Sequence, residues 1–160
     1  MKIIEASFNE IPDIVMLNSF VQKLHHEIHP DVFKPVSDDI TVNKFFKHVL
    51  SGENNIVLVA YIKNEPAGYS WMELQIKKDF SLKYGRKQAY IHQIAVHEDF
   101  RTKHVGTALF EELEKIAKNK GIDHFELDSW KFNNGAHKFF EQLGFETYNI
   151  KMWRKPKDAT

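Results

Sequence analysis

The sequence contains no cysteine. A chain without thiols cannot form disulfide bonds, hold a metal through thiolates or use a cysteine nucleophile. Its stability must therefore come from a packed core and its chemistry from other side chains. With 160 residues, of which 42% are hydrophobic, the chain is long enough to bury one core. We expect a single domain over residues 1–160.

Membrane-length apolar runs and an excess of charge of one sign are also lacking. Residues 1–5 lead directly into a strand-like segment, with no apolar signal region before it. The 22 basic residues are balanced by 22 acidic residues, so no polyanion is favoured as a partner over the whole surface. We therefore expect a cytoplasmic protein that binds neither membrane nor nucleic acid.

The apolar periodicity that is present predicts an α/β fold. Strands are expected over residues 2–7, 56–63, 67–77, 90–96, 122–128 and 145–154, with a hairpin turn at 64–66. Helices are expected from an N-cap at Asn9 to about His29, from a cap at Ser37 or Asp38 to Leu50, from 105 to a C-terminal cap at Gly121, and over 134–143.

The segment after the strand at 90–96 carries the clearest chemical signal. Residues 101–108 read RTKHVGTA, a compact basic turn that runs straight into a helix. A helix beginning there aims its unpaired N–H groups and the positive end of its dipole at one point. The segment therefore predicts a phosphate-binding site.

Three segments stand in a fixed order along the chain. They are the strand ending Ile94-Ala95-Val96, the turn Arg101-x-x-His104-x-Gly106, and the run Asn133-x-x-Ala136-x-x-Phe139-Phe140-Glu141-x-x-Gly144-Phe145. This pattern resembles the GNAT superfamily of acyl-CoA-dependent N-acetyltransferases. The resemblance implies a mixed, mostly antiparallel central sheet flanked by helices, with splayed central strands, and acetyl-CoA as cosubstrate.

The resemblance also implies which residues contact the cosubstrate. Pyrophosphate binding falls to Arg101, Thr102, Lys103, His104, Val105, Gly106 and Thr107. The backbone of Ile94 and Val96 would pair with pantetheine, the N–H of Ile94 or Ala95 would face the developing oxyanion, and Asn133 would contact CoA. Two positions depart from the family pattern: His104 replaces the usual glycine, and Phe140 replaces a tyrosine that can protonate the departing thiolate.

A base is needed because the acceptor amine arrives protonated near pH 7. Strand alternation places His92 on one face with Tyr90, Ile94 and Val96, and the resemblance sets it beside the thioester. Histidine in general can accept a proton near neutral pH. The alternative is that His92 is a core residue with no catalytic role. Tyr90 and Glu73 are further catalytic candidates. No metal site is expected, because His25, His26 and His29 have no third ligand of clear spacing.

These features predict an N-acetyltransferase that moves an acetyl group from acetyl-CoA to a primary amine by direct attack. The acceptor is a small-molecule or peptide amine of unspecified identity, and homodimer formation is left open. The alternative is a catalytically weak acyl-CoA-binding sensor or scaffold, which His104 and Phe140 favour.

Overall fold

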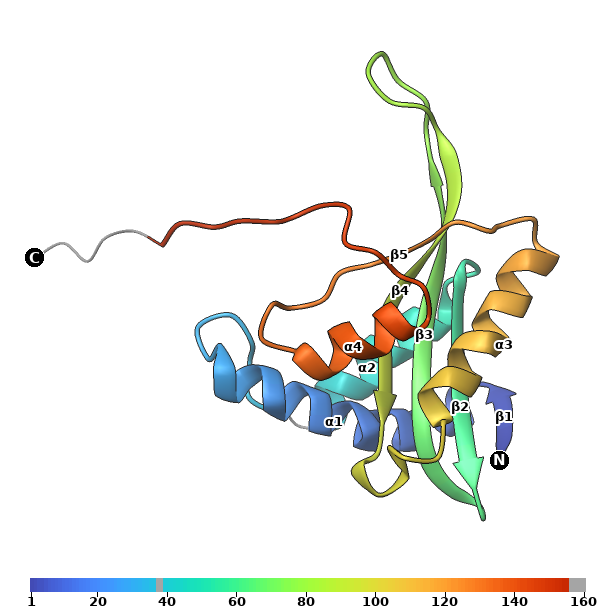
Figure 1. Cartoon of the computed structure of the whole chain (residues 1–160). Helices are drawn as coiled ribbons and strands as arrows, with labels where there is room; N and C mark the ends of the chain where they lie inside the picture. The colour runs from blue at the N-terminus through green and yellow to red at the C-terminus, as the bar shows by residue number, and fades with distance from the viewer. Residues whose placement is uncertain (37–38, 156–160) are drawn as a thin grey trace, which may run out of the picture. The chain divides into compact units, whose positions relative to one another are not determined.

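The computed structural model describes residues 1–36 and 39–155 (Figure 1). The chain separates into two compact units, Met1–Asp128 and Ser129–Thr160. The two units are described separately below. Among the described residues, no helix combines the length and apolar character needed to cross a membrane.

The first unit holds one five-stranded sheet with the order β1-β2-β3-β4-β5. Its elements are β1 (Lys2–Glu5), α1 (Ile11–Ile28), α2 (Asp39–Ser51), β2 (Asn55–Ile62), β3 (Glu65–Lys77), β4 (Arg86–Val96), α3 (Val105–Asn119) and β5 (Phe125–Leu127), with short 3-10 turns η1 (Phe8–Glu10) and η2 (Glu98–Phe100). Among the described strands, only the β4–β5 pair is parallel. The expected mixed, mostly antiparallel α/β fold is confirmed.

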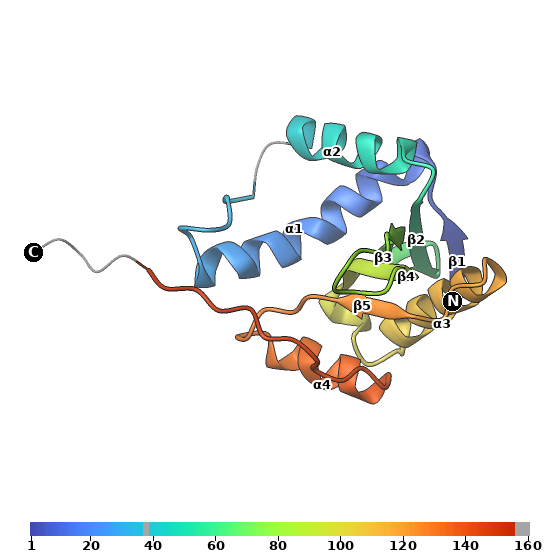
Figure 2. The same ribbon diagram turned by 90° about the horizontal axis from the view of Figure 1, so that it is seen from above.

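Helices cover both faces of this sheet. The helices α1 and α2 lie on one face and α3 on the other (Figure 2). Strand β2 shows why, since Ile56 and Leu58 join the cluster under α3 while Val57 and Val59 join the cluster under α1 and α2. Because successive side chains of a strand point to opposite faces, an unbroken apolar run predicts a strand that is buried on both sides.

Strands β4 and β5 stay together over a short distance only. They pair at Ala89–Phe125, Tyr90–Glu126 and Ile91–Leu127, whereas residues 93–96 of β4 pair with no described strand except β3. The β4 edge that faces away from β3 is therefore open after Ile91. This is the splay of central strands that the sequence pattern implied.

A β-bulge interrupts β4 at His92. Trp71 pairs with Gln93 and Met72 pairs with Ile91, so His92 has no partner in the register. The extra residue reverses the alternation that follows it. His92 stacks on Trp71, which packs against the α1/α2 cluster, whereas Val96 packs against the α3 cluster. The prediction that His92 and Val96 share a face is therefore wrong, because unbroken alternation cannot anticipate an inserted residue.

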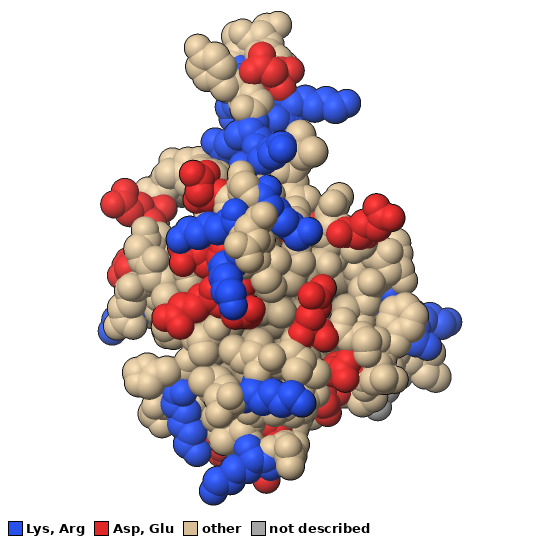
Figure 3. Space-filling view, turned by 90° about the vertical axis from the view of Figure 1, so that its right-hand side faces the viewer, with Lys and Arg blue, Asp and Glu red and all other residues tan. Residues whose placement is uncertain are grey.

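Strands β3 and β4 extend beyond their neighbours as a hairpin arm, defined here as residues 75–87 (Figure 1). The last β2 pairing is with Glu73, and β5 pairs with β4 no earlier than Ala89. The arm exposes apolar side chains at its tip, with Leu82 at 88% and Tyr84 at 96% exposure. Lys and Arg side chains gather around its stem (Figure 3), and the arm contains Lys77, Lys78, Lys83, Arg86 and Lys87.

Two local predictions in this unit need correction. Ser7, not Asn9, caps the first helical turn, through a capping box in which Glu10 bonds back to the Ser7 backbone. The β2–β3 turn consists of Lys63 and Asn64, both with positive φ as a tight two-residue hairpin requires, so it precedes the predicted position. The predicted caps Ser37 and Asp38 lie outside the described residues.

The second unit contains α4 (Asn134–Gln142), close to the helix predicted over 134–143. Asn133 caps it by accepting a hydrogen bond from Ala136 N at 3.1 Å. The predicted strand over 145–154 is wrong, because none of these described residues joins a strand. A strand requires a pairing partner, and alternation within one segment carries no information about that partner.

Candidate active site

The bulge residue His92 and Glu73 form the centre of the site. His92 Nε2 lies 2.8 Å from Glu73 Oε2, and their side chains are 26% and 35% exposed. The imidazole stacks on the Trp71 indole at a centroid distance of 4.0 Å and an interplanar angle of 17°. Trp71 is itself held by a 2.8 Å hydrogen bond from its Nε1 to Asn55 Oδ1. The imidazole is thus fixed in plane and in direction while remaining accessible.

Glu73 is held as a carboxylate by its neighbours. Gln75 Nε2 donates to Glu73 Oε2 at 3.0 Å, on the same oxygen that faces His92. The hydrogen bond from Gln75 lowers the pKa of Glu73 most, followed by that with His92. Donors to a carboxylate stabilise its charged form. Glu73 is therefore an ionised acceptor beside the imidazole at neutral pH.

Tyr90 also contacts His92, and their ring centroids are 4.8 Å apart in an edge-to-face contact. The Tyr90 hydroxyl donates to Asp128 Oδ2 at 2.8 Å. Burial raises the pKa of Tyr90, and the hydrogen bond to Asp128 raises it further. The hydroxyl thus keeps its proton, which makes Tyr90 a poor base. Its ring packs against His92 and borders the site.

The open edge of β4 presents backbone groups in an alternating pattern. His97 N donates to Ala67 O on the β3 side at 2.9 Å. Since alternate residues of an antiparallel strand direct their backbone groups to opposite edges, Val96 and Ile94 direct theirs away from β3. Ala95 directs its groups to β3. Of the three predicted cosubstrate contacts on β4, Ile94 and Val96 have the better placed backbone.

The basic turn connects this edge to α3. Its residues 101–104 are exposed. Phe100, just before the turn, is buried, and Lys103 Nζ lies 5.1 Å from the centroid of its ring. His104 is the residue before the helix and has a φ of 56°, in the left-handed region. Glycine adopts that conformation without strain. This explains why the family pattern has glycine at the position that His104 occupies here.

The first turn of α3 supplies backbone donors. Ala108 N is the first to bond within the helix, to His104 O at 3.0 Å, so the amides of Val105, Gly106 and Thr107 precede the ladder. Val105 is fully buried under β3. Gly68 permits this packing, because a Cβ there would lie 2.7 Å from Ala95 O and 3.0 Å from Val105 Cγ1. The helix start, the basic turn and the open edge therefore form one continuous strip.

Asn133 and Phe140 belong to the second unit. The Asn133 side chain serves as the α4 cap. Phe140 makes ring contacts with Phe139 and Phe145, at 5.2 Å and 5.7 Å between centroids. Their predicted roles toward CoA stay predictions.

The structure brings the predicted catalytic candidates His92, Glu73 and Tyr90 together on adjacent strands. Sequence reasoning missed the residues that hold them directly or through a neighbour, namely Asn55, Gln75, Gln88 and Asp128. The available signal was the recurrence of amides and carboxylates at every second position of strands that are otherwise apolar. Their partners lie on other strands, so the pairing itself became visible only in the fold.

Comparison with known proteins agrees with this architecture. Residues 19–145 match the acetyltransferase (GNAT) family. The uncharacterized N-acetyltransferase MJ1207 of Methanocaldococcus jannaschii is 31% identical over 115 residues, which are 68% of this chain and 47% of that protein. The chain spans 25% to 56% of the length of three curated relatives that it matches.

Solved structures give the same result. A tetramutant of the BH1408 protein from Bacillus halodurans has a TM-score of 0.90 at 27% identity, covering 98% of this chain and 100% of that one. The aminoglycoside N-acetyltransferase AAC(6')-Iy in complex with CoA has a TM-score of 0.73 at 13% identity, covering 98% and 99%. The second likeness shows a shared fold alone.

Proposed function

The chain belongs to the acetyltransferase (GNAT) family, and from this premise we propose that it is an acetyl-CoA-dependent N-acetyltransferase acting on a primary amine. The observation that carries the proposal is the pair formed by His92, at the β4 bulge, and Glu73 of the neighbouring β3. His92 lies two residues before Ile94, whose backbone faces the open edge of β4. Strand β4 thereby carries both a proton acceptor, His92, and the backbone N–H groups of Ile94 and Val96. We also propose that residues 1–160 act as a single catalytic domain.

The residues of α3 and its turn suit the phosphates of the cosubstrate. The amides of Val105, Gly106 and Thr107 and the positive end of the helix dipole attract an anion, and Arg101 and Lys103 add positive charge. The backbone of Ile94 and Val96 is available to pair with amide groups of pantetheine. A backbone N–H at this edge would stabilise the negative charge that develops on the thioester oxygen.

In the proposed reaction, His92 accepts a proton from the acceptor ammonium, and the freed amine attacks the thioester carbonyl. A C–N bond forms, the C–S bond breaks with its electron pair on sulfur, and the nitrogen loses its second proton to solvent. Because a thiol is a fair leaving group, with an ordinary pKa of about 8.5, the thiolate can depart and be protonated by water. Phe140 supplies no hydroxyl for that step.

A second candidate function is an acyl-CoA-binding sensor or scaffold that transfers nothing. Two observations favour it: His104 occupies a left-handed position that suits glycine, and the chain has phenylalanine at position 140, where the family resemblance implies a tyrosine. Both features affect the rate or affinity of a transferase as well. Binding alone therefore does not separate the two candidates.

A thiol-release assay separates them. Acetyl-CoA is incubated with the protein and a panel of amines that includes a polyamine, an aminoglycoside, a lysine peptide and a peptide with a free N-terminus. The proposal expects CoA release that depends on one class of amine and exceeds the hydrolysis measured without acceptor. CoA binding by calorimetry with no amine-dependent release from any member would favour the sensor.

A further inference from the structure

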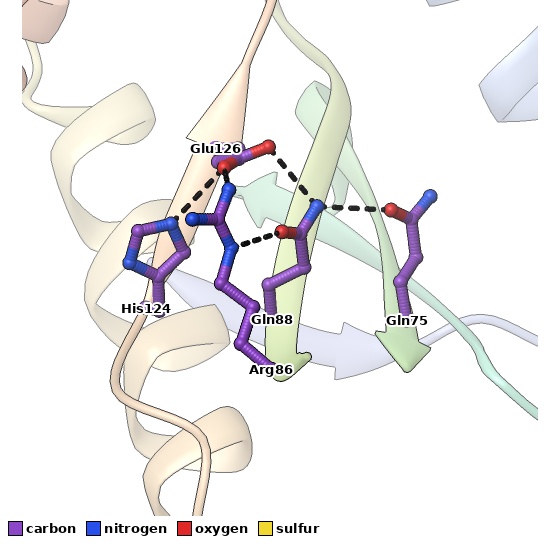
Figure 4. Close-up of polar contacts among 5 residues, drawn as sticks. All are labelled: Gln75, Arg86, Gln88, His124 and Glu126. Carbon is purple, nitrogen blue, oxygen red and sulfur yellow. Dashed lines mark hydrogen bonds and ion pairs between the residues drawn. The ribbon is translucent and has the colours of Figure 1, made fainter. Parts of the chain in front are cut away.

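A network of side-chain hydrogen bonds runs across three strands from His124 to Gln75 (Figure 4). From Gln75 it continues to the His92–Glu73 pair. Gln88 is its centre and is completely buried. Gln88 Nε2 donates to Gln75 Oε1 at 3.0 Å, and Gln75 Nε2 donates to Glu73 Oε2 at 3.0 Å. Gln75 and Gln88 are direct partners in the β3–β4 register. The two amides therefore connect the core of the sheet to the carboxylate beside His92.

The far end of the network is anchored by charge. Arg86 Nε donates to Gln88 Oε1 at 2.9 Å, and the Arg86 guanidinium also pairs with Glu126. Gln88 Nε2 donates a second bond to Glu126 Oε2 at 3.0 Å, and His124 Nε2 lies 3.1 Å from Glu126 Oε1. Every hydrogen-bonding atom of the buried Gln88 amide is thus engaged, as burial of a polar group requires.

The donor-to-acceptor direction of these hydrogen bonds is set by Arg86 at one end and Glu73 at the other. A guanidinium can only donate and an ionised carboxylate can only accept. Gln88 must therefore turn its oxygen to Arg86 and its nitrogen to Gln75, and Gln75 must turn its nitrogen to Glu73. Neither amide can flip without placing two donors or two acceptors face to face. The network consequently delivers a fixed N–H to one defined oxygen, Glu73 Oε2.

The ionised Glu73 carboxylate determines the protonation pattern of the histidine, and the bond from Gln75 holds that carboxylate in place. Because Glu73 Oε2 accepts, the Nε2 of His92 at 2.8 Å must carry a hydrogen and donate it. In the neutral ring the lone pair then resides on Nδ1. A partner that fixes one ring nitrogen as a donor selects the tautomer and the orientation of the other.

We propose that Gln75 and Gln88 are positioning residues that hold His92 in the Nε2–H tautomer, so that Nδ1 is the atom that accepts the proton of the acceptor amine. The inference rests on the proposed function for the identity of that proton. It assigns no ligand to the carboxylates themselves, because Glu73, Glu126 and Asp128 already accept hydrogen bonds from neighbouring side chains. The network holds the carboxylate that bonds to the His92 imidazole and does not form a separate cation site.

The test combines NMR of the full chain without substrate and steady-state kinetics. Long-range ¹H–¹⁵N spectra distinguish the two imidazole tautomers, and the His92→Gln variant identifies the His92 signals by their loss. Wild type should show the Nε2–H form of His92. Gln88→Met and Gln75→Met should each release the Glu73 carboxylate so that it can rotate away from His92, which should produce a mixture with the Nδ1–H form and lower turnover about tenfold, with CoA affinity unchanged. Gln142→Met, at an exposed glutamine, should change neither quantity.

Gln75→Met keeps the test decisive if the buried Gln88→Met variant fails to fold, because Gln75 is only partly buried. A wild-type His92 in the Nδ1–H form would overturn the proposal. So would a tautomer that stays Nε2–H in a folded Gln75→Met variant, whatever the activity. Failure of the proposed function is a different result: no amine is acetylated, while the tautomer still shifts in the variants.

Discussion

The proposed base is the residue on which the chemistry depends most directly. Replacing His92 by Gln keeps a polar side chain of similar size and removes proton acceptance, so turnover should fall about tenfold or more. CoA affinity should stay nearly unchanged, since the residue lies on β4 and not in the phosphate turn. Steady-state kinetics and calorimetry measure the two quantities, with Tyr90→Phe as a control that removes a hydroxyl committed to Asp128. Wild-type turnover in the variant would make His92 a core residue and Glu73 the next candidate.

The left-handed His104 gives a second prediction for a single residue. A non-glycine residue in this region is strained by roughly 1–2 kcal/mol, of which the greater chain entropy of unfolded glycine offsets about 0.5–1 kcal/mol. His104→Gly should therefore raise the free energy of unfolding by up to about 1 kcal/mol in urea denaturation. The comparison change His48→Gly, in the last turn of α2, replaces a better helix former by glycine and should lower it by no more than about 0.5 kcal/mol. A loss of stability in His104→Gly would show that its side chain makes a stabilising contact.

Much of the site was predictable residue by residue, and what was missed has a physical cause. His92, Glu73 and Tyr90 were recognisable as titratable groups on strands, and the structure places them in contact. The bulge at His92 was not predictable, because a register shift depends on the partner strand. Gln75 and Gln88 were missed for a related reason, since the hydrogen-bond partners of a side-chain amide on a strand lie largely on neighbouring strands and cannot be read from its own segment.

At the scale of elements, the start of α3 is the proposed phosphate site. A valine at Gly106 would place a branched side chain where the phosphates approach the backbone, so Gly106→Val should weaken CoA binding about tenfold or more. This is the loss expected for one charge-assisted hydrogen bond of about 1.5 kcal/mol. Arg101→Ala should weaken binding mildly, and Lys118→Ala at the far end of α3 should leave it unchanged. Unaltered affinity by calorimetry in both Gly106→Val and Arg101→Ala would reject the site.

The tip of the hairpin arm, residues 78–85, should be dispensable for folding. Its tip side chains are exposed, and Lys77 pairs with Arg86 at the last rung of the β3–β4 ladder. Replacing residues 78–85 by Asn-Gly should close that rung with a tight turn and change the free energy of unfolding by no more than about 0.5 kcal/mol. Urea denaturation measures this, with acetylation of a small amine as a second readout. A large loss of stability would mean that the arm has buried contacts in solution.

Element prediction succeeded where a segment carries its own signal. The helix at 105–119 showed helical spacing and a glycine cap, and Gly121 indeed adopts a φ of 72° after it. The strand at 145–154 failed, because strand formation depends on a second strand. The cap at Asn9 failed because Ser7 and Glu10 form a stronger reciprocal pair.

The molecule as a whole gives a prediction about cooperative folding. Both hydrophobic clusters draw their residues from the first unit, from β1 through β5. A fragment of residues 1–128 should therefore keep a cooperative thermal transition by circular dichroism, with the full chain as reference. A fragment that melts without a transition would show that the second unit is required for the core.

The exposed arm has a consequence for encounters between molecules. Beyond Leu74 on β3 and before Ala89 on β4, these strands pair only with each other among the described strands, so both outer edges carry unpaired backbone groups. Such edges can extend into a neighbouring molecule and seed aggregates, and a chain with zero net charge has little overall repulsion to prevent this. The lysines of the arm concentrate positive charge at the vulnerable edges. Two copies that approach arm to arm therefore repel one another where strand pairing would otherwise begin.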